Sequence, residues 1–129
     1  LSVCLASPLR DVYKRQVLGQ LRDVPDERRG AGFVSAVAIV VPESVASAAK
    51  LAEYDLQPEM VVEREWRGSI TRQPRGDNGF GYDPIFRPCD ADGRTSAELA
   101  PAEKDERSHR GQALRAALPL FTALAQLEA

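Results

Sequence analysis

The sequence predicts an α/β fold, because two strand patterns alternate with helical segments. Residues 33–41 are apolar at odd and even positions and rich in β-branched side chains, which is typical of a strand covered on both faces of a sheet. Residues 60–71 have the alternation of a strand with one wet face, with Val62, Arg64 and Trp66 on one side and Val61, Glu63 and Glu65 on the other. The order helix, strand, helix, strand, strand-like loop and helices favours the α/β class.

The N-terminal residues 1–16 fit no element of this fold. They begin with Leu1 and show neither helical nor strand periodicity, so they are either a sequence scar joined to an incomplete protein or a disordered leader. Residues 17–22 have helix-like apolar spacing and are followed by a stop signal at 23–26, which predicts the last turns of a helix. We therefore expect residues 17–129 to form the C-terminal part of a single domain.

The middle of the chain predicts a short helix and a tight turn. Apolar residues three and four apart predict a helix within residues 42–54, with Ser44 as a candidate cap. The sequence Asp77-Asn78-Gly79 is a turn signal, because these residue types tolerate positive φ. Asp83 precedes a proline and is pushed out of the helical region. Ile85 and Phe86 are then expected to pack inward.

Two helices are expected near the C-terminus. Pro101 suits the first position of a short helix, where its missing N–H costs nothing. Ser108 is placed to cap the final helix, and Pro119 is expected to kink or break it, because an interior proline costs about 3 kcal/mol. The apolar stripe expected to face the sheet is Leu114, Ala117, Leu118, Phe121 and Leu124.

Composition excludes several classes of function. The net charge of −2 over 129 residues argues against broad nucleic-acid binding. The longest apolar stretch, residues 33–42, is shorter than the roughly 20 residues that span a bilayer, so no membrane role is expected. Two cysteines provide neither a disulfide framework nor a paired-cysteine metal motif. A reducing, cytoplasmic location is therefore expected.

The run from Asn78 to Pro84, followed by Lys104 and then Ser108-His109-Arg110, favours a nucleoside triphosphate site. Aromatic rings can stack on a base for roughly 1–3 kcal/mol, and Phe80 is the candidate platform. Arginine suits the acceptor oxygen of a 6-oxo purine edge. A helix start beside these donors favours anions.

Each of these residues also has a structural explanation. The rings of Phe80 and Tyr82 could belong to the core, and Asp83 could be only the turn residue before a proline. His109 could be a satisfied histidine at a helix start, and Lys104 a solvated charge. The other basic residues of this region are interpreted as solvent-facing charges, namely Arg72, Arg75 and Arg94.

Three segments, GFGYDPIF, GRTSAEL and EKDERSHRGQAL, resemble the C-terminal part of the inosine triphosphate pyrophosphatase family. The resemblance runs from Val17 to the end of the chain. It implies a mixed sheet flanked by helices and hydrolysis of non-standard purine nucleoside triphosphates (ITP, dITP, XTP) to monophosphate and pyrophosphate, which cleanses the nucleotide pool. It also implies Mg²⁺ and a homodimer. The substrate-binding residues that it implies are Phe80, Gly81, Tyr82, Asp83, Lys104, His109 and Arg110.

The family's metal carboxylates, general base and phosphate loop belong to an N-terminal half that this sequence does not match. We name no catalytic or metal residues, and the pairs Glu63 with Glu65 and Asp90 with Asp92 are interpreted as solvated. The chain alone is expected to be weakly stable and inactive. Alternative functions are a non-catalytic nucleotide-binding module or a structural α/β interaction domain. The nucleotide hypothesis requires the aromatic turn and the start of the last helix to share one cleft.

Overall fold

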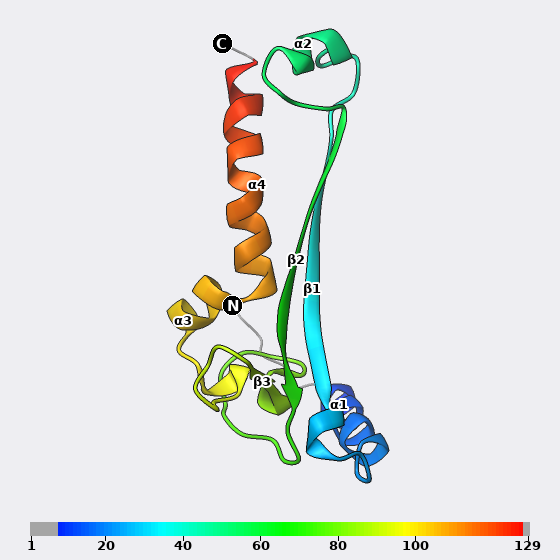
Figure 1. The fold of residues 1–129 in the computed structure, drawn as a ribbon, viewed down its shortest axis with the longest axis vertical. Helices are drawn as coiled ribbons and strands as arrows, with labels where there is room; N and C mark the ends of the chain where they lie inside the picture. The colour runs from blue at the N-terminus through cyan, green and yellow to red at the C-terminus, as the bar shows by residue number, and fades with distance from the viewer. Residues whose placement is uncertain (1–7, 128–129) are drawn as a thin grey trace. The chain divides into compact units, whose positions relative to one another are not determined.

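The computed structural model describes residues 8–127. Its helices and strands confirm the α/β class (Figure 1). The chain divides into two units, which are described separately: unit 1 holds the described residues before Phe33 together with 66–105, and unit 2 holds 33–65 and those from 106 onward. The elements are α1 (Pro8–Gln20), η1 (Asp26–Arg28), β1 (Gly30–Val40), α2 (Ala48–Ala52), β2 (Glu59–Ile70), η2 (Asp83–Ile85), β3 (Phe86–Pro88), η3 (Ser96–Glu98), α3 (Pro101–Arg107) and α4 (His109–Gln126), where η marks a 3₁₀ turn.

The sheet has the strand order β1-β2-β3. The bonds from Val41 N to Pro58 O (2.8 Å) and from Ile70 N to Arg29 O (2.9 Å) fix β1 and β2 as an antiparallel pair. Strand β3 is also antiparallel to β2, with Ser69 opposite Arg87. Both long strands were predicted from the sequence to within a few residues.

Only one face of β1 is covered. Along the strand, partly buried residues such as Phe33 and Ile39 alternate with exposed ones, and Val34 and Val40 are 56% and 67% exposed. The expectation of a strand buried on both faces is therefore wrong. A run of β-branched residues reflects the preference for extended backbone, and it does not by itself report what covers each face.

The core of unit 2 lies where α2 meets the C-terminal part of α4 (Figure 1). Val41, Leu51 and Leu56 are buried there, with Leu120 and Leu124 of α4 against them. Helix α2 is shorter than expected. Its cap is the Ser47 side chain, which accepts from Lys50 N, so the prediction of Ser44 as the cap is wrong. The residues before Ser47 form a turn.

Helix α4 buries a different face from the one predicted. Ala113 and Ala117 are fully buried, whereas Leu114, Leu118 and Phe121 are 58%, 60% and 45% exposed. Along this part of α4, the small side chains of Ala113 and Ala117 lie on the buried face, and Leu114 and Leu118 lie on the exposed face. The predicted stripe is therefore wrong except for Ala117 and Leu124.

The helix also continues through Pro119, which is exposed, so the predicted break is wrong and the predicted kink stays a prediction. The packing of Leu120 and Leu124 on the following turn holds the backbone helical. Tertiary contacts thus override the local cost of the proline, about 3 kcal/mol.

The buried face of α4 can be tested with two adjacent substitutions. Ala117→Leu is expected to lower the free energy of unfolding by about 1–3 kcal/mol, because a fully buried site has no room for three more carbons. Leu118→Gln is expected to change it by less than about 0.5 kcal/mol, because the side chain is mostly in water. Urea denaturation of both variants measures the difference. A larger loss of stability for Leu118→Gln than for Ala117→Leu would instead support the stripe predicted from the sequence.

The core of unit 1 forms around β3. Ile85 and Phe86 are buried as predicted, and the Phe86 ring meets the Trp66 ring edge-on at 5.4 Å between centroids. The indole Nε1 of Trp66 donates to Asp90 Oδ1 (3.0 Å). Asp90 is therefore a hydrogen-bond acceptor for the core tryptophan, a more specific role than that of a solvated carboxylate.

Helix α1 starts earlier than predicted. It begins at Pro8, so the helix covers residues that the sequence pattern left unassigned. Polar residues dominate that stretch, and a largely solvated helix carries little apolar periodicity to detect. Residues 1–7 lie outside the described residues, so the interpretations of residues 1–16 as a scar or leader remain predictions. Within residues 8–127, no helix has both the length and the apolar character needed to cross a bilayer.

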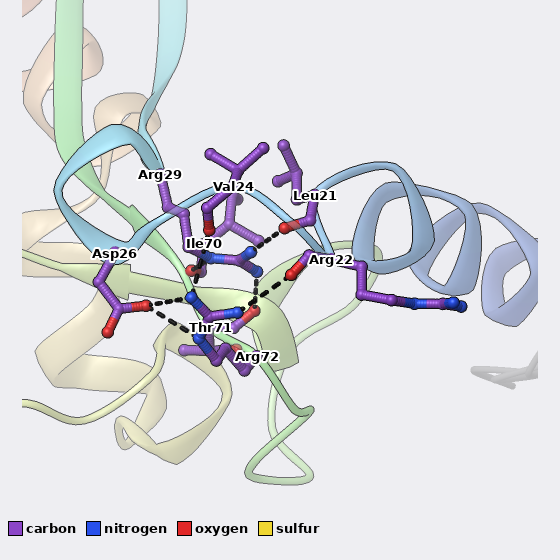
Figure 2. Close-up of polar contacts among 8 residues, drawn as sticks. All are labelled: Leu21, Arg22, Val24, Asp26, Arg29, Ile70, Thr71 and Arg72. Carbon is purple, nitrogen blue, oxygen red and sulfur yellow. Dashed lines mark hydrogen bonds and ion pairs between the residues drawn. The ribbon is translucent and has the colours of Figure 1, made fainter.

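A buried arginine just before β1 joins the turn that follows α1 to the end of β2 within unit 1 (Figure 2). Arg29 is 3% exposed. Its Nε donates to Ile70 O (2.9 Å), one Nη donates to Thr71 O (2.8 Å), and the other donates to Leu21 O. The guanidinium group thus donates to three main-chain carbonyl groups, one in the turn after α1 and two at the end of β2. We call this arrangement the Arg29 clamp.

Arg72 extends the same arrangement at the surface (Figure 2). Its guanidinium contacts Asp26 Oδ1 at 2.8–2.9 Å and donates to the carbonyls of Arg22 (3.3 Å) and Val24 (3.2 Å). Arg72 is therefore a structural residue, and the prediction that it is only a solvent-facing charge is incomplete.

Candidate functional site

The glycine-rich turn predicted from the sequence is present in unit 1. Asn78 anchors it, because its main-chain N–H donates to Ala97 O (2.9 Å) and its side chain donates to Leu99 O (3.0 Å). Gly79 follows with φ of +76°, and Gly81 has φ of +64°. At Gly79 an added Cβ would lie 2.2 Å from Asp83 Oδ2. Glycine is needed there for both the backbone and the space.

Asp83 is the centre of this turn. Its carboxylate is 6% exposed and accepts three hydrogen bonds. Oδ1 accepts from Ser96 Oγ at 2.9 Å, while Oδ2 accepts from Phe80 N at 2.8 Å and from Lys104 Nζ at 2.6 Å. A buried charge needs such partners, because its desolvation costs several kcal/mol. Asp83 is therefore far more than the residue that precedes a proline.

Lys104 on α3 is held beneath the aromatic turn. Its side chain is 19% exposed, and its ammonium lies 5.1 Å from the centroid of the Phe80 ring while it pairs with Asp83. A cation over an aromatic face is attracted by the ring quadrupole. The interpretation of Lys104 as a solvated charge is wrong, because burial and two partners fix it in place.

The two aromatic rings of the turn do not belong to the core. Phe80 is 52% exposed and Tyr82 is 40% exposed, whereas the neighbouring Phe86 is 1% exposed. The alternative in which both rings are core residues is therefore wrong. A half-exposed phenylalanine, fixed from below by an ammonium, is a surface on which a planar ring can stack.

The segment 95–98 supports the turn, and sequence reasoning missed it as part of the site. The Thr95 side chain and Glu98 form a reciprocal capping box around η3, with Thr95 N donating to Glu98 Oε1 (2.9 Å). Donation from the Thr95 backbone N–H holds the pKa of Glu98 below its usual value, against the opposing effect of burial. The pattern Thr-x-x-Glu is a detectable signal for such a cap. Ser96, which donates to Asp83, has no comparable signal.

Two other arginines near the turn have structural partners. Arg94 forms a two-pronged contact with Glu103, with N–O distances of 3.2 and 2.9 Å, and this hydrogen bonding raises the pKa of Arg94. Arg75 contacts Glu98 at 3.3 Å and donates to Gly93 O. These ion pairs explain both arginines without a ligand, although the carboxylates make them more than solvated charges.

A cavity of about 300 Å³ in unit 1 is lined by four arginines: Arg29, Arg72, Arg75 and Arg87. Three of these side chains already donate to main-chain carbonyls. The cavity therefore follows from the Arg29 clamp and its neighbours, and we place the candidate nucleotide site at the aromatic turn instead.

The remaining predicted site residues belong to unit 2. Ser108 caps α4 as predicted, because its Oγ accepts from Gly111 N (3.1 Å). His109 stacks on Phe33, with ring centroids 5.0 Å apart and the planes 15° from parallel. This stacking contact was not predicted from the sequence, and the role of His109 stays a prediction. Arg110 is exposed. The shared cleft of these residues with the aromatic turn stays a prediction.

No metal centre can be built from the described residues. Residues 8–127 contain no cluster of three or more His, Cys, Asp and Glu side chains arranged to hold an ion. Two carboxylates beside the turn are occupied by protein donors: Asp83 by Ser96 and Lys104, and Glu103 by Arg94. These oxygens do not fit a Mg²⁺ site, which needs free carboxylate ligands and water.

The comparison with known families decides the relationship. Residues 9–120 match the model of the Ham1 family. The chain belongs to the Ham1 family. The match begins at residue 9, ahead of Val17, where the resemblance seen in the sequence begins. It confirms the recognition made from the three segments.

Relatives within the Ham1 family agree with this assignment. A dITP/XTP pyrophosphatase from Corynebacterium urealyticum is 54% identical over 112 residues, which cover 87% of this chain and 50% of that protein. A crystal structure named as a nucleoside-triphosphatase / dITP/XTP pyrophosphatase from Mycobacterium abscessus matches with a TM-score of 0.64 at 52% identity, covering 87% of this chain and 50% of that one. A HAM1 protein from Coxiella burnetii matches with a TM-score of 0.66 at 36% identity, covering 93% of this chain and 52% of that one.

The chain spans about half the length of these relatives. The structural matches show that its α/β fold is that of the corresponding part of Ham1 proteins.

Proposed function

We propose that this chain is the base-recognising part of a nucleoside triphosphate pyrophosphatase. The proposed substrates are non-standard purine nucleotides such as ITP, dITP and XTP, which are hydrolysed to the monophosphate and pyrophosphate. The observation that carries the proposal is the half-exposed Phe80 ring above the Lys104 ammonium, in a chain 54% identical to a dITP/XTP pyrophosphatase. We also propose the cytoplasm as its location and a homodimer as its assembly.

In this proposal the purine stacks on Phe80, and Tyr82 borders the pocket. Lys104 polarises the ring from below and carries positive charge close to the nucleotide. His109 and Arg110 supply donors for the 6-oxo edge, where adenine would present a donor of its own. Selection of deaminated purines over adenine then follows from unpaired donors, since two facing donors leave both without an acceptor.

Hydrolysis also requires groups that these residues do not provide. Mg²⁺ supplies charge neutralisation at the phosphates in phosphoryl transfer generally. Because the described carboxylates do not fit a magnesium site, we place the metal ligands and the general base outside residues 8–127. The chain by itself is expected to bind nucleotide and to release no pyrophosphate.

Nucleotide binding tests the proposal directly. ITP is titrated into the chain by calorimetry, with ATP as the comparison nucleotide. Phe80→Ala is expected to weaken ITP binding by at least about fivefold, because stacking contributes roughly 1–3 kcal/mol. The matched control is Phe121→Ala, which removes a phenylalanine of similar exposure from α4 and is expected to leave affinity unchanged.

Three outcomes separate the alternatives. Selective ITP binding that depends on Phe80 supports the proposal. Absence of binding to either nucleotide favours the interaction domain. The exposed apolar residues of β1 and α4 support that alternative. Mg²⁺-dependent pyrophosphate release by this chain would overturn the assignment of the catalytic groups to other residues.

A further inference from the structure

Ser96 is a buried polar residue that has no role in the proposed function as described above. It is fully buried at the start of η3, and its hydroxyl donates to Asp83 Oδ1 at 2.9 Å. A serine hydroxyl can turn toward water or a main-chain carbonyl in most settings. Here it is directed at a carboxylate that is itself buried, which makes a charge-assisted bond of the stronger kind.

The two oxygens of Asp83 have separate partners. Oδ1 receives the hydroxyl of Ser96, whereas Oδ2 receives the Phe80 N–H (2.8 Å) and the Lys104 ammonium (2.6 Å). Rotation of the carboxylate about its Cβ–Cγ bond moves both oxygens together, and this terminal torsion is intrinsically broad. A donor on Oδ1 therefore fixes the direction in which Oδ2 points.

We propose that Ser96 is a positioning residue of the nucleotide site, whose hydroxyl orients the Asp83 carboxylate so that Oδ2 holds both the Phe80 backbone and Lys104. The inference rests on the proposed function. Through Asp83, Ser96 fixes the platform ring and the cation below it before any base arrives. Such preorganisation improves affinity, because the ordering cost is met in the free protein.

The geometry at Gly79 supports this reading. The closest atoms to an added Cβ at position 79 are Asp83 Oδ2 at 2.2 Å and Lys104 Nζ at 3.0 Å among side-chain polar groups. The Asp83–Lys104 pair therefore occupies the space immediately beside the turn. A carboxylate that rotated away from Ser96 would lose its place against Gly79 and Phe80 together.

Thr95 provides a matched control. It is also fully buried and adjacent in sequence, but its hydroxyl donates to Arg75 O (2.6 Å), a main-chain acceptor. Ser96→Ala and Thr95→Val each remove one buried hydroxyl. Only the first removes a donor from Asp83. A general loss of stability affects both variants, whereas a positioning effect appears in one.

The first measurement is amide hydrogen exchange at Phe80, read by NMR under native conditions. Ser96→Ala is expected to speed this exchange at least tenfold relative to Ile85, whose N–H donates to Tyr82 O (3.0 Å) in the same segment. Thr95→Val is expected to leave the ratio within twofold of the original. Ser96→Cys, with a weaker donor of similar size, should fall between serine and alanine. This variant also decides the question where the alanine variant does not fold.

The second measurement is ITP affinity by calorimetry, with an expected three- to tenfold loss for Ser96→Ala and none for Thr95→Val. An unchanged Phe80 exchange ratio overturns the positioning role whatever the affinity. Faster exchange with unchanged ITP affinity overturns its link to the nucleotide. If the unsubstituted chain binds no ITP, the proposed function fails, while the exchange ratio still decides whether Ser96 orients Asp83.

Discussion

Replacing Asp83 by alanine is expected to lower the free energy of unfolding by about 3 kcal/mol. The substitution leaves Lys104, Ser96 and the Phe80 N–H without their shared acceptor at a site where the carboxylate was 6% exposed. Removing one partner of a buried ion pair costs about 3–5 kcal/mol, since the other charge remains desolvated. Urea denaturation followed by tryptophan fluorescence measures the loss, because Trp66 lies in the same unit.

The control for this experiment is Asp77→Ala, which removes an exposed carboxylate from the same turn and should change stability by less than about 0.5 kcal/mol. A second test combines Asp83→Ala with Lys104→Met. Removal of both charges is expected to recover part of the loss, because no uncompensated ammonium remains. Equal losses for Asp77→Ala and Asp83→Ala would contradict the central role given to Asp83.

Arg29→Ala is expected to have an effect of similar size, about 3 kcal/mol. Three carbonyl groups lose their donor in a site where Arg29 was 3% exposed, and each unsatisfied buried acceptor costs roughly 1–3 kcal/mol. Arg29→Lys should recover little of the loss, because a lysine ammonium lacks the planar fork that reaches separated acceptors. Thermal unfolding by circular dichroism compares the two variants with the original chain.

The neighbouring Arg28 is the matched control, since it is exposed and carries the same charge. Arg28→Ala is expected to be near neutral. If lysine restored the stability of the Arg29 variant fully, charge alone would account for the effect, and the clamp geometry would not matter.

Much of the fold was predictable because its signals are local. Alternation located β2, Pro101 marked the first residue of α3, and the Ser108 cap marked the start of α4. These features depend on residues close in sequence, where the physical preference is nearly independent of the rest of the chain.

The errors concern burial, which distant residues decide. Pro119 was expected to interrupt α4, but packing of the following turn keeps the helix continuous. The stripe from Leu114 to Leu124 was assigned to the buried face of α4 from its helical period, yet Ala113 and Ala117 are buried while Leu114 and Leu118 are exposed. Hydrophobicity ranks residues by average burial, and this helix departs from that average.

For the candidate site, the sequence predicted which residues belong to it, and the structure shows how they contact one another. Phe80, Asp83 and Lys104 were all named from the sequence, and the structure adds that Asp83 joins the other two. Ser96 was missed because a serine between a threonine and an alanine carries no signal of a long-range bond. Nothing in a sequence states that residues 13 apart share one hydrogen bond.

Gly79 has a consequence for how this turn can vary among related proteins. Asparagine, the usual substitute where φ is positive, meets the backbone requirement but collides with Asp83, and alanine fails on both grounds. Position 79 is therefore expected to remain glycine while other positions of the turn change. A larger residue there would require the Asp83 side chain to be replaced by a shorter one or to move away. Sequence change in the turn is then directed to the flanking rings of Phe80 and Tyr82, whose exposed surfaces tolerate exchange without disturbing the ion pair below.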